Sequence, residues 1–309
     1  MTDGSIYDGI ILVDKNEGET SFDVVRKTKR AIQNKKVGHA GTLDPFATGL
    51  LIILLGQGTK LSNYLMSGKK KYLATMTLGV VTDTLDKTGS ILREMAFPYV
   101  DEEEIRRVLQ RFKGDIEQRP PAYSAINYKG RRAYKLARQG KAVDLEKRVV
   151  TIHSINVVSV NLPDITFDVT CSRGTYIRTL AAEIGERLGS AAHLKSLRRL
   201  SSGVFEVSDA LDSKMIGLVC GGSDLAERII SVKDALPDMK ECSIDYKTAK
   251  KVINGIRPGR DESCFRDASL DDYKGFIKLT IGPSLVAIIE VEHPSRDEKP
   301  WLKNIRVFT

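Results

Sequence analysis

Alternating apolar and polar positions predict several strands in the first half of the chain. The clearest alternation runs through Ile165–Ser172, where every second side chain is apolar, as in a strand with one buried face. Arg173-Gly174 then ends the pattern. Three further segments are also predicted as strands, namely Ile10–Val13, Tyr72–Gly79 and Val149–Val160.

Apolar residues at helical spacing predict helices between these strands. Asp101 is placed to cap a helix that runs to Gly114, with Glu104 in the capping-box position. Thr20 or Ser21 caps a second helix, which continues to about Ile32, and a third begins at an N-cap Thr175 and ends at Gly189. Strands and helices mix without the regular alternation of a parallel βαβ fold. The expected fold class is therefore α+β, with a mixed, mostly antiparallel sheet and flanking helices.

The length of 309 residues favours two domains, because it exceeds the size that one core usually serves. Ser223–Leu236 has helical spacing and is expected to pack and end before Pro237, with Met239–Cys242 as a linker. The expected domains are residues 1–237 and 242–309. In the second, a helix over Tyr246–Ile253 and strands over residues 276–282, 285–292 and 301–308 predict a small β-rich module. The charged segment Asp261–Lys274 fits no pattern.

The charge balance indicates a polyanionic partner. Lys and Arg number 48 against 40 Asp and Glu, giving a net charge of +8 and a pI of about 9.2. The cations concentrate between Arg119 and Arg148, where Tyr123, Tyr128 and Tyr134 are interleaved with them. Basic side chains neutralise phosphates while aromatic rings stack on bases, which suits looped RNA. The alternatives are a generic basic enzyme, or a solvated face carrying core tyrosines.

Other patterns narrow the class of protein. The four cysteines (Cys171, Cys220, Cys242 and Cys264) have no metal-ligand spacing, and we expect them to be reduced and buried. The four histidines are scattered, and no glycine-rich nucleotide loop occurs. No leader or long apolar stretch is present, which predicts a cytoplasmic protein. Chemistry is expected to run on side chains alone, with no cofactor and no metal.

Asp44 is the strongest candidate for that chemistry. It lies in Gly38–Leu51, where Pro45 pushes it into an extended conformation and Gly38, Gly41 and Gly49 permit tight backbone paths. The segment is predicted to be a shaped loop that presents the carboxylate. An Asx-type turn, in which the carboxylate only binds local backbone, is the alternative.

The Gly38–Leu51 segment closely resembles the motif around the catalytic aspartate of TruB-type tRNA pseudouridine synthases, which isomerise the uridine at position 55 in the T loop of tRNA. Four further segments resemble motifs of the same family in the same order: Val13–Val25, Lys69–Gly79, Arg119–Arg138 and Cys171–Gly189. The resemblance implies the pseudouridine synthase fold. The tail resembles the PUA domain, an RNA-binding module, best at Asn254–Gly259.

The resemblance also implies roles for single residues. Asp44 would be the catalytic carboxylate, Arg178 the guanidinium that pairs with it, and Tyr72 the side chain against the flipped uracil. The other substrate-binding candidates are Tyr176 and Leu197 as pocket walls, His39 near the vacated base, Lys15 as support for the Asp44 loop, and Arg131 and Arg132 on RNA. From local sequence alone, the alternative is that the Arg178 side chain extends into solvent.

The remaining candidates keep plainer alternatives. Tyr72 and Leu197 also suit an ordinary core, and His39 a loop hydrogen bond. Arg198 and Arg199, beside Leu197, are in a position to reach phosphates.

The expected activity is base flipping, Asp-dependent cleavage of the C1′–N1 bond and rejoining through C5. Asp44 would act as a nucleophile or as a base on the ribose, and the sequence does not choose between them. The expected partner is the T arm of tRNA, bound by a monomer. The alternatives are a tRNA-binding or tRNA-folding protein without turnover and a guide-RNA-directed relative. Retention of Asp44, Tyr72 and Arg178 together favours the enzyme.

Overall fold

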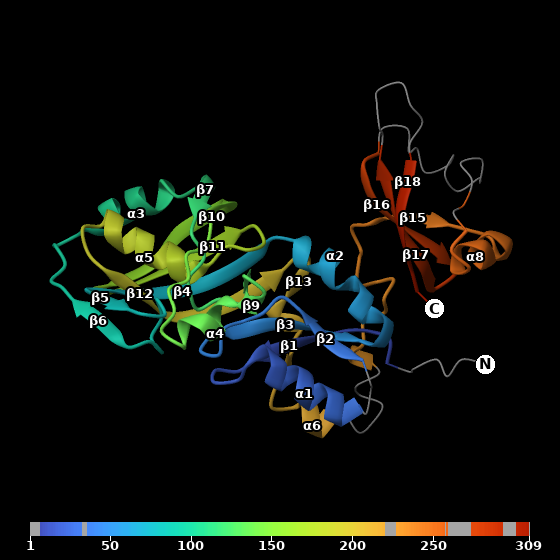
Figure 1. The fold of residues 1–309 in the computed structure, drawn as a ribbon, viewed down its shortest axis with the longest axis horizontal. Helices are drawn as coiled ribbons and strands as arrows, with labels where there is room; N and C mark the ends of the chain where they lie inside the picture. The colour runs from blue at the N-terminus through green and yellow to red at the C-terminus, as the bar shows by residue number, and fades with distance from the viewer. Residues whose placement is uncertain are drawn as a thin grey trace.

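A computed structural model describes residues 7–32, 36–219, 227–256, 258, 273–292 and 301–308. Within these residues, ten strands form one mixed sheet, with a main order of β14-β1-β3-β12-β4-β11-β10-β7 (Figure 1). β2 adds to β3, and β13 adds to β12. Only the β1–β14 and β3–β12 pairs of this sheet are parallel. The expected α+β class with a mostly antiparallel sheet is confirmed.

The strands of the large sheet are β1 (Gly9–Lys15), β2 (Val37–Ala40), β3 (Thr48–Leu55), β4 (Lys70–Leu78), β7 (Gly114–Gln118), β10 (Arg148–Asn161), β11 (Asp164–Cys171), β12 (Ala192–Ser202), β13 (Phe205–Glu206) and β14 (Leu211–Asp212). Two small hairpins lie outside it, β5 (Val80–Thr82) with β6 (Ile91–Glu94) and β8 (Asn127–Tyr128) with β9 (Arg131–Arg132). The helices before residue 220 are α1 (Ser21–Ile32), α2 (Ser62–Ser67), α3 (Glu102–Gln110), α4 (Ala133–Ala137), α5 (Ile177–Arg187) and α6 (Ile216–Val219), with short 3-10 turns at Gly56–Leu61 and Val207–Asp209.

Helices α3 and α5 lie over the half of the sheet that contains β10, β11 and β4, and α1 lies beside β2 at the other end (Figure 1). Two predicted helix starts are confirmed. The Asp101 carboxylate accepts from the Glu104 N–H at 2.7 Å, and the Thr20 hydroxyl accepts from the Asp23 N–H at 3.0 Å. Acceptors at these positions satisfy amide groups that the first helical turn leaves unpaired. Both helices therefore begin where their polar caps indicate.

The start of the third helix was predicted wrongly. Tyr176 is the N-cap residue of α5, and its side chain makes no capping hydrogen bond. The Thr175 hydroxyl instead donates to the Ser172 carbonyl at 3.0 Å, which closes the turn after β11. Gln118 instead binds the N-cap residue itself, because its side-chain oxygen accepts from the Tyr176 N–H at 2.7 Å. The start of α5 is thus fixed to a residue 58 positions away and not by a local cap.

The helix expected over Ser223–Leu236 does not reach Leu236, because only Glu227 and Arg228 of its described part are helical. Ile230 and Ile10 exchange two backbone hydrogen bonds of 2.9 and 3.0 Å, so the segment is bridged to β1. Residues 223–226 lie outside the described residues. Tertiary pairing at a buried strand has overridden the helical spacing, which marks the same residues as apolar in either conformation.

The C-terminal part forms a separate sheet of four strands in the order β15-β16-β17-β18. Its elements are β15 (Lys240–Ser243), α8 (Tyr246–Ile253), β16 (Gly275–Ile281), β17 (Ser284–Glu292) and β18 (Trp301–Val307). The predicted helix and three strands are present. The predicted linker Met239–Cys242 is largely strand, because β15 pairs in parallel with β16. The division of the chain into domains and the likeness to a PUA domain stay predictions, and Asn254–Gly259 lies only partly within the described residues.

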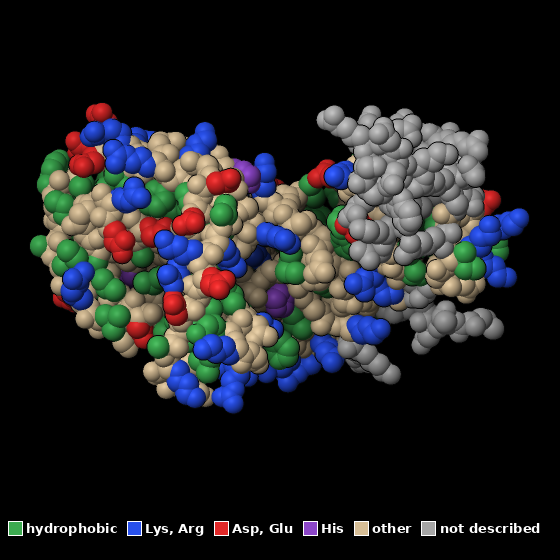
Figure 2. Space-filling model, turned by 45° about the horizontal axis from the view of Figure 1, so that its top comes forward, with side chains coloured by type: hydrophobic (Ala, Val, Ile, Leu, Met, Phe, Trp, Pro, Cys, Tyr) green, Lys and Arg blue, Asp and Glu red, His purple; other side chains and the backbone are tan. Residues whose placement is uncertain are grey.

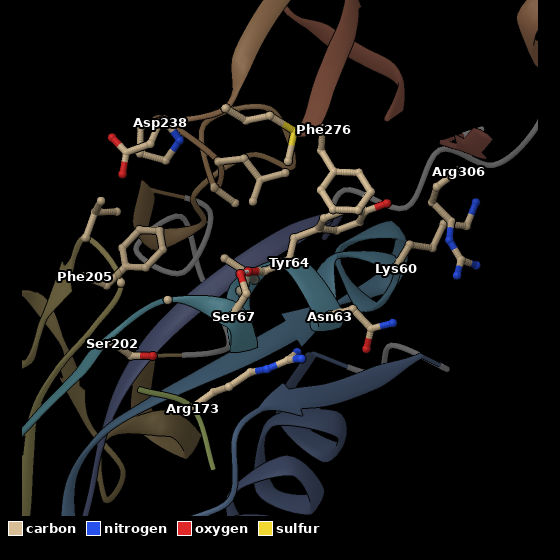
Figure 3. Close-up of a pocket in the computed structure, with 18 of the residues that line it drawn as sticks. Lys60, Asn63, Tyr64, Ser67, Arg173, Ser202, Phe205, Asp238, Phe276 and Arg306 are labelled. Atoms are coloured by element: carbon tan, nitrogen blue, oxygen red, sulfur yellow. Dashed lines mark hydrogen bonds between the residues drawn. The ribbon is translucent and has the colours of Figure 1, made fainter. Parts of the chain in front are cut away.

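A groove of about 1210 Å³ separates the C-terminal sheet from α2 and the 3-10 turn before it. The Tyr64 ring of α2 meets the Phe276 ring of β16 edge to face, with centroids 5.0 Å apart (Figure 3). Lys60 donates to the Val307 carbonyl at 2.8 Å. Arg173 and Arg306 also line the groove. The side chains that line the groove therefore include both cations and aromatic rings.

The described residues contain no helix long and apolar enough to cross a membrane and no cluster of metal-ligating side chains. Cys171 and Cys242 are buried and are not disulfide-bonded within the described residues, as expected. Burial raises the pKa of the Cys171 thiol to about 11, which keeps it protonated and unreactive near neutral pH. Cys220 and Cys264 lie outside the described residues.

Candidate active site

The loop between β2 and β3 holds Asp44 in place through contacts with the start of α1. The buried Ser21 hydroxyl accepts from the Leu43 N–H at 2.9 Å and donates to the Leu43 carbonyl at 3.2 Å. The Pro45 carbonyl accepts from the Gly18 N–H at 2.8 Å. Both residues that flank Asp44 are thus fixed to one other segment. These contacts fix the loop in addition to its glycines, of which Gly41 and Gly49 have positive φ. Only the role of the glycines was predicted.

Asp44 forms an ion pair with Arg178, as the sequence prediction implied. The Arg178 Nε lies 3.0 Å from Asp44 Oδ2, although its N–H is not directed at that oxygen, and Nη2 donates to Oδ1 at 3.4 Å. The Arg178 side chain is only 5% exposed, whereas 33% of the Asp44 side chain remains exposed. The carboxylate therefore has a fixed cation behind it and an open side in front of it.

Arg178 also joins the site to two other segments. Its Nη1 donates to the Thr84 carbonyl at 2.8 Å, and Nη2 donates to the Tyr123 carbonyl at 2.9 Å. Its Nη1 lies 3.3 Å from Asp86 Oδ2, whose side chain is 5% exposed. One guanidinium thus ties together the Asp44 loop, the β5–β6 turn and the beginning of the basic segment. It does not extend into solvent.

The environment of Asp44 disfavours its charge. Burial raises the pKa of the Asp44 carboxyl, and the nearby Asp86 carboxylate raises it further, while Arg178 and Lys15 oppose the shift. A carboxyl whose pKa is moved upward in a partly open site is typical of functional acids and bases. The balance of these charges decides at what pH Asp44 is ionised.

Lys15 lies fully buried beneath the same loop. Its ammonium donates to the Glu19 carbonyl at 2.7 Å, to the Asn16 carbonyl at 2.9 Å and to the Pro45 carbonyl at 3.3 Å. Burial lowers the pKa of Lys15 to about 8, although Glu19 and Asp44 oppose the change. The predicted contact between Lys15 and the Asp44 loop is therefore present as a direct hydrogen bond.

Tyr72 and Leu197 lie on neighbouring central strands. In the β4–β12 register, Tyr72 is opposite Arg199, and Leu197 is opposite Ala74. Both side chains are buried, with exposures of 9% and 7%. Burial raises the pKa of the Tyr72 phenol, and the positive charge of Arg199 on the neighbouring strand opposes that shift.

Arg199 does not have the predicted access to phosphates, whereas the Arg198 side chain remains 38% exposed. Arg199 is only 1% exposed, because it lies on the face of β12 that packs against the core. Arg198 points to the other face, where it forms a two-pronged pair with Asp14 at 3.0 and 2.6 Å. The two arginines were predicted from charge alone, and their strand gives them opposite environments.

The other two predicted pocket residues occupy the edges of this region. The Tyr176 ring is partly buried, with the Arg148 guanidinium stacked 4.9 Å from its centroid. His39 lies in β2 with an Nδ1 that is buried and has no hydrogen-bond partner. Burial lowers the pKa of His39, and Arg199 lowers it further. A neutral imidazole with one unused nitrogen is therefore present near the loop.

Arg131 and Arg132 are exposed on β9, in the hairpin with β8. Arg132 donates to the Ala125 carbonyl at 2.6 Å. The face shown in Figure 2 is hollowed near its middle, with a histidine at the hollow and Lys and Arg side chains around it. These two arginines are not part of the cluster around Asp44, but Tyr123, at the start of the same segment, contacts Arg178.

Sequence reasoning missed three residues of this cluster. Asp86 lies in a Thr- and Asp-rich turn, and its burial could not be read from that pattern. Gln118 and Ser21 each make two hydrogen bonds to the backbone of one residue, 58 and 22 positions away. Arg199 was noticed for its charge but assigned to the surface. Only the Leu-Arg-Arg-Leu alternation after Leu194 indicated that one of the two arginines must face inward.

Comparisons with known proteins identify relatives of this chain. A family model described as "TruB family pseudouridylate synthase (N terminal domain)" matches residues 29–177. A tRNA pseudouridine synthase B of Geobacter sulfurreducens is 42% identical over 255 residues, covering 82% of this chain and 84% of that protein. One of Syntrophus aciditrophicus is 40% identical over 310 residues, covering 97% and 98%.

Solved structures share the fold. A Cbf5-Nop10-Gar1 complex contains a chain that is 24% identical with a TM-score of 0.72, covering 99% of this chain and 85% of that one. An archaeal box H/ACA sRNP Nop10-Cbf5 complex gives 23% identity and a TM-score of 0.71, covering 98% and 86%. At this identity the likeness concerns the fold.

Proposed function

The chain belongs to the TruB family of pseudouridylate synthases, and from this premise we propose that Asp44, Arg178 and Tyr72 form its catalytic centre. The protein isomerises uridine in tRNA to pseudouridine. We further propose that the uridine is the one at position 55 in the T loop and that a monomer binds the T arm. The name shared by the relatives favours an enzyme over a protein that binds or folds tRNA without turnover.

The observation that carries the assignment is the ion pair between the buried Arg178 and the partly exposed Asp44. Arg178 is held by two backbone carbonyls, so it cannot follow Asp44 if the carboxylate moves. A carboxylate that has a fixed cationic partner and one exposed side is positioned to attack a ribose carbon. Arg178 favours the ionised form that either chemical route requires.

The isomerisation conserves atoms and electrons. The C1′–N1 bond breaks, and its electron pair goes to the uracil ring. Asp44 either bonds to C1′ or removes a proton from the ribose, and both routes are reversed when C5 attacks the sugar. C5 then loses its proton and N1 gains one, so no oxidant or reductant is needed. Tyr72, which is buried on β4, contacts the displaced uracil in this proposal.

Contacts with RNA are proposed at two places besides the pocket. The first is the hairpin that carries Arg131 and Arg132. The second is the groove beside the C-terminal sheet, which is lined by Arg173, Arg306 and the Tyr64 ring (Figure 3). In this proposal, RNA that extends from the active site passes along the groove. Cations and rings of this kind hold a nucleic-acid backbone and its bases without reading sequence. The PUA-like role of residues 242–309 rests on this groove.

Tritium release from T-arm transcripts labelled at C5 of uridine tests the function. The label leaves only when C5 loses its proton. We expect release from the uridine corresponding to position 55 and from no other labelled position. Tight binding without release would support the binding-protein alternative. Release from a different position would keep the enzyme class and refute the T-loop site.

Replacing Arg131 and Arg132 with alanine is expected to weaken tRNA binding roughly tenfold and to leave the rate at saturation unchanged. Two phosphate contacts would be lost, so the slope of log K against log salt should fall by about 1–2. Filter binding at several salt concentrations measures both quantities. Arg106→Ala with Arg107→Ala on α3 is the matched control, because it removes the same charge from adjacent exposed arginines. An unchanged slope in the first variant would remove the hairpin from the interface.

A further inference from the structure

The basic segment Arg119–Lys147 is joined to the large sheet at a single pair of residues. Gln118 is the last residue of β7 and Arg148 is the first residue of β10, and the two lie opposite each other in the antiparallel register. The segment that carries Arg131 and Arg132 therefore leaves the sheet at Gln118 and returns to it at Arg148.

Both members of this pair contact Tyr176. The fully buried Gln118 side chain accepts from the Tyr176 N–H at 2.7 Å and donates to the Tyr176 carbonyl at 3.1 Å. The Arg148 guanidinium lies over the Tyr176 ring, 4.9 Å from its centroid. Tyr176 is thus held at its backbone by one end of the basic segment and at its ring by the other end.

The surroundings of Arg148 favour its contact with that ring. Its Nη2 donates to the Gly174 carbonyl, but its Nε is buried without a hydrogen-bond partner, and Arg148 forms no ion pair with a residue that the structure describes. Gly174 has φ +84°, and a Cβ there would lie only 3.3 Å from the guanidinium carbon. Glycine therefore leaves room for the planar group. The face of an aromatic ring attracts a cation, and here it takes the place of a carboxylate.

The first turn of α5, which follows Tyr176, contacts the same segment again. The Thr179 hydroxyl donates to the Arg119 carbonyl at 3.4 Å, and Arg178 Nη2 donates to the Tyr123 carbonyl at 2.9 Å. The Nε of the same Arg178 side chain lies 3.0 Å from Asp44 Oδ2. The base of the basic segment and the Asp44 ion pair are therefore connected through one helical turn.

We propose that Arg148 is a positioning residue, which holds the Tyr176 ring as a wall of the uracil pocket and thereby links the basic segment to the active site. The inference rests on the proposed function and on the proposed place of Tyr176 in the pocket. The guanidinium covers one face of the ring, so a flipped base meets only the remaining face or edge. A wall that is already fixed does not have to be ordered when the base enters. Arg148 itself does not touch the substrate.

Arg148→Lys tests whether the planar group or the charge matters, because lysine keeps the charge and loses the flat guanidinium. Single-turnover tritium release at saturating enzyme is expected to fall by about 5–20-fold, while the Kd for tRNA changes less than about twofold. The matched control is Arg187→Lys on α5, where the guanidinium lies 5.7 Å from the centroid of the Phe112 ring. The control should keep both quantities. Weaker binding with an unchanged rate at saturation would assign Arg148 to RNA phosphates and overturn the inference.

Combining Arg148→Lys with two changes at Tyr176 tests the ring contact itself. Tyr176→Phe keeps the ring, so Arg148→Lys should cost as much in this background as in the wild type. Tyr176→Leu removes the ring, and there the same change should cost less than about twofold. Should Tyr176→Leu not fold, Tyr176→Met takes its place. Equal losses in all three backgrounds would overturn the inference alone, whereas absence of release by the wild type would refute the proposed function together with it.

Discussion

Asp44→Asn is expected to abolish pseudouridine formation, with a loss of at least about 10⁴-fold, while tRNA affinity changes less than about threefold. The amide retains the size of the carboxylate and an oxygen for Arg178 to contact, so the pocket keeps its shape. It is neither a nucleophile toward C1′ nor a base toward the ribose. Single-turnover tritium release measures the first effect, and filter binding measures the second. A variant that still releases tritium at a tenth of the wild-type rate would refute the role of Asp44.

The same variant is expected to be as stable as the wild type or more stable by about 0.5–2 kcal/mol near neutral pH. Burial raises the pKa of Asp44 in the folded state, so the fold favours the protonated carboxyl over the ionised one. Stability supplied by that preference is present below the unfolded pKa and is lost as pH rises through the folded pKa. Asparagine avoids this loss. Its advantage in Tm should therefore shrink as the pH is lowered, and an advantage that grows on acidification would contradict the sign.

Arg178→Met is expected to destabilise the protein by about 3–5 kcal/mol, because it leaves the buried Asp86 and the half-buried Asp44 without their common cation. Urea unfolding measures this loss. The remaining activity should also show a shifted pH profile. Arg178 lowers the pKa of Asp44, so its removal raises that pKa, and the rate should begin to fall at a higher pH on acidification. An acid limb at the wild-type position would separate Arg178 from the ionisation of Asp44.

Combining Arg178→Met with Asp86→Asn is the control for this interpretation. The second change removes the like charge beside Asp44 and should restore part of the lost stability. It should also move the acid limb back toward lower pH, since Asp86 contributes to the raised pKa of Asp44. Recovery of neither quantity would mean that Arg178 acts mainly through the Thr84 and Tyr123 carbonyls.

Most elements of the fold could be predicted because their signals are local. Alternation identified β11, and the polar caps at Thr20 and Asp101 gave the starts of α1 and α3. The failures occurred where a distant partner decides the conformation. Ile230 is bridged to Ile10, and α5 begins without a local cap, at a Tyr176 whose N–H is bound by the distant Gln118. Neither Ile10 nor Gln118 can be identified from the sequence next to the element whose conformation it affects.

The candidate site divides in the same way. Asp44, Tyr72 and Arg178 were predicted through short motifs, and the structure brings Asp44 and Arg178 into contact. Arg199 was assigned to phosphates because its charge was visible and its burial was not. Asp86 was missed because a Thr- and Asp-rich turn has the composition of a surface loop. The sequence shows which groups are present, whereas the sheet register decides which of them lose contact with water.

The order of strands across the sheet also bears on how the protein is made. β3 follows β1 in the chain and pairs with it, but its other neighbour over Thr48 and Gly49 is β12, which is synthesised about 150 residues later. Asp44 therefore emerges from the ribosome long before Arg178, which pairs with it, and Arg199, which binds the Gly41 and Leu50 carbonyls on either side of it, have been synthesised. The part of β3 that pairs with β12 therefore stays unpaired until β12 has been synthesised. Pairing between strands so far apart in the sequence forms slowly. The active site of a nascent chain is thus completed only when β12 has left the exit tunnel.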